Sequence, residues 1–387
     1  MTTARVRLGI VGLGLIAQAV HLPNLRTLRD DFDVVHMCDL SAQLADQLAA
    51  EWGGQVRTST DPAAVFADPD VDAVLLLTPG THAALTEQAL RAGKHVLAEK
   101  PFAHSAAEAL ACADLAADNG RVLQVGYMKM YEPMLARARA ELANLGTIRL
   151  VRVTVLHPAD EPQFSHVRYV RGGDADPAVI DAASADEDRR LDQAVGAVAE
   201  PLRSMYADVL QGSACHELSL LRALFDDASP SFAFAQLGEF TAGERLAAPP
   251  QLQALGRLGP AQLAWSWNWL PDYPEYGEEI AVFGDAGRLR LTMPAPYTLS
   301  ARAKLEVERM DGDERSVNRM TGEPRTGFEE ELRAFHACIT AGTPVRSDAR
   351  GAAADCTALQ QLTRRLAETY GVAHTLGGEA ARLGEVA

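Results

Sequence analysis

The chain has 387 residues, of which 48% are hydrophobic, and this length and apolar content predict two domains rather than one ordinary core. The formal net charge of −16 argues against a general nucleic-acid-binding protein, because such binding depends on lysines and arginines that neutralise phosphates. No run approaches the ~20 apolar residues of a membrane span, and the first residues lead directly into a strand-like segment. We therefore expect a cytoplasmic protein with no membrane partner.

Five cysteines are scattered along the chain without a C-x-x-C pair. This pattern indicates neither a disulfide framework nor a zinc site, so we expect reduced, mostly buried thiols and no bound metal. The sequence Cys215-His216-Glu217 does not change this expectation, because no second histidine follows at helical spacing.

Between residues 6 and 125, short β-rich apolar runs alternate with alanine-rich helical stretches. That alternation is typical of βαβ units, and it predicts six parallel strands in a doubly wound sheet over a first domain of residues 1–126. Two helix starts support the pattern, because Asp61 precedes Pro62 as an N-cap, and Ser105 and Glu108 match a capping box.

From residue 127 to residue 387 the pattern changes, and we expect one α+β domain with an antiparallel or mixed sheet. A helix around residues 132–146 and a strand over residues 147–157 come first. The polar stretch 157–200 follows. It is either a part-loop, part-helix excursion beside a site or a solvated surface insertion.

A helix around residues 213–225 precedes a series of strand-like runs, and two helices that begin near residues 326 and 349 close the domain. The tail after residue 377 is expected to fray. The three tryptophans of one run lie on a single strand face, which favours sheet packing or a subunit interface over sugar stacking. The strand-like runs cover 231–240, 261–270, 278–284 and 287–293.

The first strand-like run leads into Gly12-Leu13-Gly14-Leu15-Ile16-Ala17, a G-x-G-x-x-A turn that opens a helix. The first glycine permits the tight turn, the second lets a dinucleotide's pyrophosphate approach the backbone, and the helix N-terminus offers N–H groups. Asp39, at the end of the next strand, is placed to bind the ribose hydroxyls and to repel the additional phosphate of NADP. We therefore predict a Rossmann domain that binds NAD, and NADP remains an alternative.

Glu99-Lys100-Pro101 directly follows the strand-like run at residues 95–98. The carboxyl end of such a strand borders the crevice where doubly wound sheets bind ligands, so we expect Lys100 to reach a ligand rather than only solvent. Pro101 restricts Lys100 to extended backbone, and the bond between them is a candidate for the cis form.

Four stretches of the chain resemble, in order, the glucose-fructose oxidoreductase and inositol dehydrogenase family (Gfo/Idh/MocA). They are GIVGLGLIAQAVHLPNL, TPGTHAALTEQALRAGKHVLAEKPFAHSAAEA, VGYMKMYEP and EEIAVFGDAGRLRL. The resemblance implies a Rossmann domain followed by an open, predominantly antiparallel sheet whose exposed face forms a homodimer or homotetramer. It also implies hydride transfer between nicotinamide and a hydroxyl or keto carbon of a small sugar, polyol or sugar derivative.

The resemblance implies roles for individual residues. Lys100 would touch the reacting hydroxyl, with Glu99 near the nicotinamide. Tyr127, Lys129 and Tyr131 are candidates for the substrate site, although many relatives carry arginine where this chain has Lys129. The residues implied for the dinucleotide are Gly12, Gly14, Leu15, Ile16, Asp39, Thr78, Pro79, His82, Glu99 and Lys100.

His216 matches the histidine of the family's D-x-G-x-H-x-x-D pattern, which implies that it binds substrate and acts as an acid–base group. The two outer aspartates of that pattern are Gly212 and Ser219 in this chain. Asp208 or Glu217 is a candidate for the missing carboxylate, although Glu217 is expected to point elsewhere on its helix.

These residues predict a nicotinamide-dependent dehydrogenase or reductase in which Lys100 or His216 takes the hydroxyl proton as hydride leaves the carbon. Two alternatives stay open. One is a glycoside-cleaving enzyme that retains its NAD, and the other is a non-catalytic sensor of the same fold. The missing aspartate at Gly212 favours the sensor, and the presence of Lys100 argues against it.

Overall fold

The computed structural model describes residues 5–159, 163–196, 198–245, 251–298, 301–372 and 374. The chain forms two compact units, each discontinuous in sequence. Unit 1 comprises Met1–Met128, Val167–Gln193 and Glu331–Ala353, and unit 2 comprises Lys129–His166, Ala194–Glu330 and Ala354–Ala387. The first change of unit, after Met128, lies close to the boundary expected after residue 126. The tail after residue 377 lies outside the described residues.

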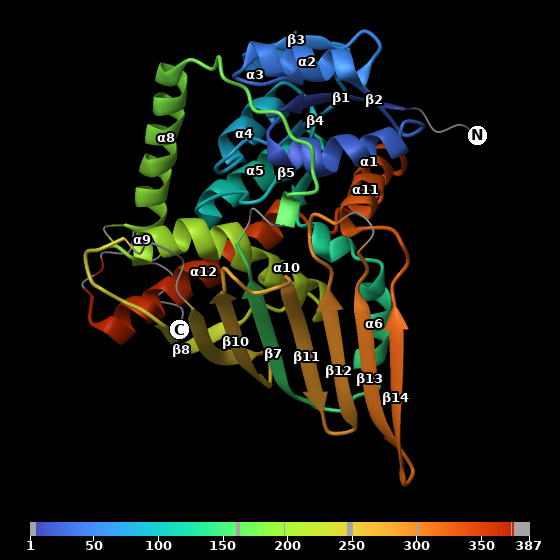
Figure 1. Cartoon of the computed structure of the whole chain (residues 1–387), viewed down its shortest axis with the longest axis vertical. Coiled ribbons are helices and arrows are strands. Elements are labelled where there is room, and N and C mark those ends of the chain that lie inside the picture. The colour runs from blue at the N-terminus through green and yellow to red at the C-terminus, as the bar shows by residue number, and fades with distance from the viewer. Residues whose placement is uncertain are drawn as a thin grey trace. The chain divides into compact units, whose positions relative to one another are not determined.

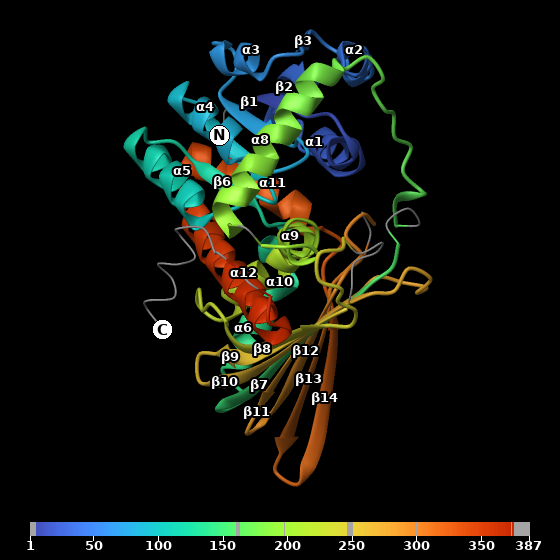
Figure 2. The same cartoon turned by 90° about the vertical axis from the view of Figure 1, so that its left-hand side faces the viewer.

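Unit 1 contains a six-stranded parallel sheet with the strand order β3-β2-β1-β4-β5-β6. Figure 1 labels β1 to β5, and Figure 2 labels β6. The order reverses beside β1, which confirms the predicted doubly wound arrangement and places the carboxyl ends of all six strands along one edge. The strands are β1 (Val6–Val11), β2 (Phe32–Cys38), β3 (Arg57–Ser59), β4 (Ala73–Leu76), β5 (His95–Glu99) and β6 (Leu123–Gly126). The connecting helices are η1 (Ala17–His21), α1 (Leu22–Thr27), α2 (Ala42–Trp52), α3 (Pro62–Ala67), α4 (Ala83–Arg91) and α5 (Ala106–Asp118).

Unit 2 contains an eight-stranded sheet in which every pairing is antiparallel except that of β7 with β10. Its order is β14-β13-β12-β11-β7-β10-β9-β8, which confirms the predicted open, mainly antiparallel sheet. Helices α6, α10 and α12 lie along one face of it (Figure 2). The strands are β7 (Ile148–His157), β8 (Ser231–Leu237), β9 (Leu252–Leu258), β10 (Ala261–Trp269), β11 (Gly277–Gly284), β12 (Gly287–Met293), β13 (Lys304–Asp311) and β14 (Glu314–Thr321).

The remaining helices agree with the predicted ones in number and order near the C-terminus and differ in the middle of the chain. The helix expected around residues 213–225 begins earlier, as a π-helix that continues into α10, and the polar stretch 157–200 contains a long helix, α8. These helices are η2 (Met128–Tyr131), α6 (Met134–Leu142), α8 (Pro177–Val195), α9 (Leu202–Ser204), η3 (Met205–Ala214), α10 (Cys215–Leu224), α11 (Gly327–Ala341) and α12 (Ala349–Tyr370).

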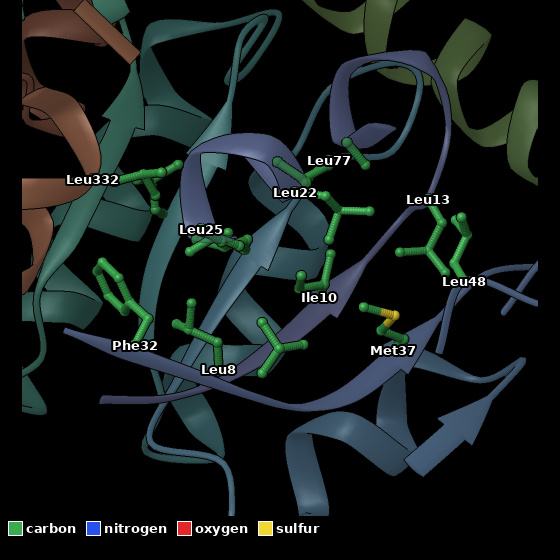
Figure 3. Packing of buried hydrophobic residues seen from close by; sticks show 14 of the residues in the cluster. Leu8, Ile10, Leu13, Leu22, Leu25, Phe32, Met37, Leu48, Leu77 and Leu332 are labelled. Carbon is green, nitrogen blue, oxygen red and sulfur yellow. The ribbon is translucent and has the colours of Figure 1, made fainter. Parts of the chain in front are cut away.

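The core of unit 1 is built from strands and helices that are distant in sequence (Figure 3). Leu8, Ile10 and Met37 contribute from the central strands and are fully buried. Leu332 and Phe335 of α11 pack into the same core, so the last part of the chain helps to close the first sheet. The predicted helix starts are also confirmed, with the capping box at Ser105 and the N-cap at Asp61.

All five cysteines are among the described residues and are buried, and none of them forms a disulfide, as predicted. Trp265 and Trp267 are buried within unit 2, which agrees with sheet packing. None of the helices that the structure describes is long and apolar enough to cross a membrane.

Candidate functional site

The turn between β1 and η1 has the geometry that its glycine pattern predicts. Gly12 has a φ of +91°, and a Cβ there would lie 2.7 Å from backbone atoms of Leu77 and Thr78, so only glycine fits. A Cβ at Gly14 would meet no described atom within 4 Å. The backbone at Gly14 therefore faces open space at the start of the helix that contains Leu15 and Ile16, which suits an approaching pyrophosphate.

Asp39 follows β2 and is fixed against the glycine turn. Its carboxylate accepts hydrogen bonds from the N–H of Leu13 at 2.8 Å and from the N–H of Ser41 at 2.9 Å. These bonds hold the carboxylate at the carboxyl edge of the sheet beside Gly14. This is where a Rossmann acidic residue binds the ribose hydroxyls of a dinucleotide.

Thr78, Pro79 and His82 follow β4 at the same edge, and His82 supports the turn that carries Lys100. The Nδ1 atom of His82 lies 2.9 Å from the carbonyl oxygen of Pro101. Burial lowers the pKa of His82 although that carbonyl and the charge of Glu99 oppose the shift, so the ring is neutral at neutral pH.

Glu99 ends β5 and places a buried anion next to Lys100. Its Oε1 atom lies 2.8 Å from Nε2 of His21, and its Oε2 atom accepts the Lys100 N–H at 3.1 Å. Burial alone would raise the pKa of Glu99, but the hydrogen bond and charge of His21, together with the charge of Lys100, lower it. Lys100 itself is half-buried, and its bond to Pro101 is cis, the form considered from the sequence.

Glu331, on α11, is a second buried carboxyl group of unit 1. Neither of its oxygens has a hydrogen-bond partner among the described residues. Burial and the charge of Glu99 raise the pKa of Glu331 well above its ordinary value, which favours the protonated carboxyl. The sequence analysis missed it, although Phe335 lies one helical turn later and marks the same buried face.

Lys129, expected to line the substrate site, lies in unit 2 between two buried carboxyl groups. Its Nζ atom donates to Glu217 of α10 at 3.2 Å and to Glu278 of β11. Tyr276 donates to Glu278 at 2.7 Å, and its hydroxyl lies 3.4 Å from the Lys129 Nζ atom. We refer to Lys129, Glu217, Tyr276 and Glu278 as the Lys129 cluster.

The Lys129 cluster carries a proton beyond that of its lysine. Burial raises the pKa of Glu217 to about 8, although Lys129 opposes the shift. Burial would lower the pKa of Lys129, but the charges of Glu278 and Glu217 outweigh it and raise that pKa. At neutral pH Glu217 is therefore largely protonated beside the Lys129 ammonium, which limits the number of charges buried in the cluster.

His216 lies on α10 and is buried. Its carbonyl oxygen accepts a hydrogen bond from the Ser219 hydroxyl at 2.8 Å. Of the two carboxylates considered as its partner, Asp208 is exposed and pairs with Arg245 at 2.7 Å, and Glu217 binds Lys129. Each candidate carboxylate thus has another partner in the structure, and the catalytic role of His216 stays a prediction.

Aromatic side chains adjoin the Lys129 cluster. The ring of His157, at the end of β7, stacks on Trp269 with centroids 5.3 Å apart and meets the ring of Tyr276 edge-on at 5.6 Å. Tyr127 and Tyr131, expected to line the substrate site, are both buried.

The structure thus joins Asp39 to the glycine turn in unit 1 and Lys129 to Glu217 in unit 2. The sequence analysis missed two members of the second group, Tyr276 and Glu278. The alternation along β11 contained a signal for one of them, because Glu278 has the same parity as the buried residues Ile280 and Val282.

Comparison with known proteins gives a family match and similar curated proteins. Residues 6–127 match the model of an oxidoreductase family with an NAD-binding Rossmann fold. An inositol 2-dehydrogenase of Rhizobium meliloti is 32% identical over 41% of this chain and 47% of its own length. A scyllo-inositol 2-dehydrogenase (NAD(+)) of Bacillus subtilis is 33% identical over 36% of this chain and 40% of its own length. The matches therefore span less than half of these relatives.

Solved structures resemble the chain over nearly its full length. A 3-ketoreductase from Actinomadura kijaniata, solved as a lysine-to-alanine mutant with NADP and TDP-benzene, has a TM-score of 0.68 and 18% identity and covers 94% of this chain and 98% of its own. An oxidoreductase from Thermotoga maritima has a TM-score of 0.70 and 16% identity and covers 98% of this chain and 100% of its own. At these identities the likeness shows a shared fold.

Proposed function

Because the chain belongs, through residues 6–127, to the Gfo/Idh/MocA oxidoreductase family with an NAD-binding Rossmann fold, we propose that it is an NAD-dependent dehydrogenase or reductase of a small sugar or polyol. The observation that carries the proposal is the open backbone at Gly14 beside the fixed carboxylate of Asp39. The substrate class is supported by relatives named as inositol 2-dehydrogenases and by a structural neighbour named as a 3-ketoreductase.

The carboxyl edge of the parallel sheet would hold the cofactor. The N–H groups after the glycine turn would bind the pyrophosphate, and the carboxylate of Asp39 would bind the adenosine ribose. Bound NAD supplies the hydride acceptor for oxidation and, when reduced, the hydride donor for reduction. The residues proposed for this contact are Gly12, Gly14, Leu15, Ile16, Asp39, Thr78, Pro79, His82, Glu99 and Lys100.

Lys100 is the proposed acid–base group. Its unprotonated Nζ atom takes the substrate hydroxyl proton as hydride leaves the carbon, and the ammonium returns that proton in the reverse direction. The backbone of Lys100 is well fixed, because Glu99 binds its N–H and His82 contacts the carbonyl of Pro101.

His216 is the second candidate for the acid–base role, and Tyr127 and Tyr131 are proposed to line the substrate. Lys129, buried between carboxyl groups, is proposed as a positioning residue at that site.

The experiment is to follow NAD⁺ reduction by absorbance with a panel that begins with inositols and continues with free sugars, glycosides and nucleotide-linked sugars. Turnover with any member is the expected result. If no compound of the panel causes NAD⁺ reduction although fluorescence titration shows that NAD⁺ binds, the result would contradict a dehydrogenase that exchanges its cofactor in each cycle. It would favour the glycoside-cleaving enzyme that retains its NAD or the non-catalytic sensor.

The assignment of Lys100 is tested with the substrate that the panel identifies. We expect Lys100→Ala to lower kcat by about 10²- to 10⁴-fold, the usual contribution of a positioned acid–base group, with NAD⁺ affinity retained. His216→Ala is measured in parallel, and the variant with the larger loss and a changed pH profile identifies the proton acceptor. Full turnover in Lys100→Ala would exclude Lys100.

The outer face of the eight-stranded sheet is the proposed homo-oligomer interface. Phe234 and Leu255 are register partners on β8 and β9 and are 41% and 53% exposed. Farther along the same face, Arg288 pairs with Glu308, and Arg319 with Glu306. The face is therefore apolar at β8 and β9 and carries charges of both signs at β12 to β14. A second copy of the chain can cover such a surface.

We propose that the reaction takes place in the cytoplasm. The five described cysteines are thiols rather than disulfides, and thiols are suited to a reducing compartment.

A further inference from the structure

A segment after the first strand of unit 2 returns to unit 1 and lies against its cofactor edge. We call residues 167–176 the strap. The side-chain amide of Gln18, in the helix after the glycine turn, donates to the Val170 carbonyl at 2.8 Å and accepts from the Val170 N–H at 2.8 Å. The same amide donates to the carbonyl of Leu13 at 2.8 Å, so the strap is tied to the glycine turn itself.

The strap places a carboxylate at the beginning of α2. Asp174 accepts a hydrogen bond from the hydroxyl of Ser41, the N-cap residue of α2, and another from the N–H of Gln43 at 3.1 Å. An anion at this position is stabilised by the free N–H groups and the dipole of the helix. The hydrogen bond from Ser41 lowers the pKa of Asp174, so the group is ionised at neutral pH.

Gly172 allows the strap to come this close. A Cβ at Gly172 would overlap the Cβ and Oγ atoms of Ser41. The absence of a side chain at this position therefore lets the strap backbone pack directly on Ser41, two residues after Asp39.

Ser41 lies where NAD and NADP differ. In a Rossmann domain the acidic residue after the second strand binds the adenosine ribose, and the additional phosphate of NADP is attached to that ribose, so it must be accommodated beside this residue. Here the adjacent hydroxyl and first-turn N–H groups, which would serve a phosphate, are already bound by the Asp174 carboxylate.

We infer that Asp174, presented by the strap, is a specificity-determining residue that makes the dinucleotide site reject NADP. The inference rests on the proposed function and adds a second carboxylate to Asp39, from a segment distant in sequence. Binding of NADP would require its phosphate to displace Asp174 or to lie beside two carboxylates, and either arrangement is unfavourable. NAD has a hydroxyl in place of this phosphate, so its binding requires neither the displacement of Asp174 nor a negative charge beside the two carboxylates.

The test compares the dissociation constants of NAD⁺ and NADP⁺ for the full chain and for Asp174→Asn, by fluorescence titration at low salt. We expect NADP⁺ affinity to rise by about tenfold in Asp174→Asn while NAD⁺ affinity changes by less than about twofold. Because the effect is a charge repulsion, the gain should shrink at high salt. Gly172→Ala, which pushes the strap away from Ser41, should shift the preference in the same direction.

Asp181→Asn is the matched control, since it removes the same charge from an exposed position on α8. It should leave both affinities unchanged. An unchanged NADP⁺ affinity in Asp174→Asn, or an equal gain in Asp181→Asn, would overturn the inference and leave NAD⁺ binding intact. Failure of the wild-type chain to bind either dinucleotide would instead overturn the proposed function together with the inference.

Discussion

Glu217 is a buried side chain of unit 2 whose protonation depends strongly on its surroundings, because it shares one buried cluster with a lysine. Since burial raises its pKa from 4.5 to about 8, the folded chain binds a proton there that the unfolded chain has already lost between those values. By linkage, this group's contribution to the free energy of unfolding is fully present at low pH and falls as the pH rises toward about 8.

Glu217→Gln tests this reading, because the amide resembles the protonated carboxyl and does not titrate. Measured by denaturant unfolding between about pH 5 and pH 9, the variant should lose the part of the pH dependence that this group causes, so its stability relative to wild type rises with pH. Glu279→Gln, on the half-exposed position next to Glu278 in β11, is the control and should retain the wild-type slope. The same slope in Glu217→Gln and wild type would contradict the assignment.

At the scale of single residues, the sequence predicted which charged residues belong to a site better than it predicted which residues contact them. Asp39 lies beside the glycine turn, as the spacing of the Rossmann pattern implies. Lys129 was expected to face a substrate, but Glu217 and Glu278 surround it, and these come from a helix and a strand that no local pattern links to Lys129. Partners of buried charges are set by long-range packing, which a pattern of neighbouring residues does not encode.

At the scale of elements, the turn from β1 to η1 offers two glycines with different constraints. Gly12→Ala should destabilise the chain by about 1–3 kcal/mol or more, since the residue has a positive φ and its Cβ would meet the backbone of Leu77. Gly14→Ala should change the stability by less than about 1 kcal/mol because its Cβ meets no described atom.

The binding assay separates the two glycines further. We expect Gly14→Ala, although folded, to lose about tenfold or more in NAD⁺ affinity, because the Cβ occupies the place where the pyrophosphate approaches. Thermal unfolding and fluorescence titration on the same samples measure both effects. A stable Gly14→Ala variant with wild-type NAD⁺ affinity would be incompatible with dinucleotide binding at this turn.

Elements with a strong periodicity were predicted, and several other strands were missed. Six parallel strands were predicted, and five of them and the two C-terminal helices were located, but β3 was not assigned to any residues. The strands β9, β13 and β14 were not assigned, and β14 shows why, since nearly all its residues are exposed and it carries no apolar alternation. An edge strand of this kind forms because β13 pairs with it, which is a property of the sheet rather than of the segment.

At the scale of the whole molecule, the outer face of the eight-stranded sheet predicts the state of association. We expect wild-type chain to be a dimer or tetramer by light scattering, and Leu255→Asp to shift it toward the monomer, because a buried, unpaired carboxylate at the apolar end of the face is costly. Ile180→Asp, at an equally apolar and exposed position on α8, should leave the mass unchanged. A monomeric wild type, or an unaffected Leu255→Asp, would contradict this interface.

The discontinuity of the two units could not be read from the sequence. The return of the strap depends on single contacts, such as Gln18 with Val170 and Ser41 with Asp174, which involve ordinary polar residues at no fixed spacing. Because the sequence does not indicate such contacts, the polar stretch 157–200 could be interpreted equally as an excursion beside a site or as a solvated surface insertion.

The division of unit 1 into three segments also affects how the protein is made. Its sheet is complete at residue 126, but Leu332 and Phe335, which join the core that contains Leu8 and Ile10, are synthesised about 200 residues later. At about 5–20 residues per second, the ribosome needs on the order of ten seconds or more to reach them. For that interval we expect the nascent sheet to expose an apolar face that chaperones can bind until α11 emerges.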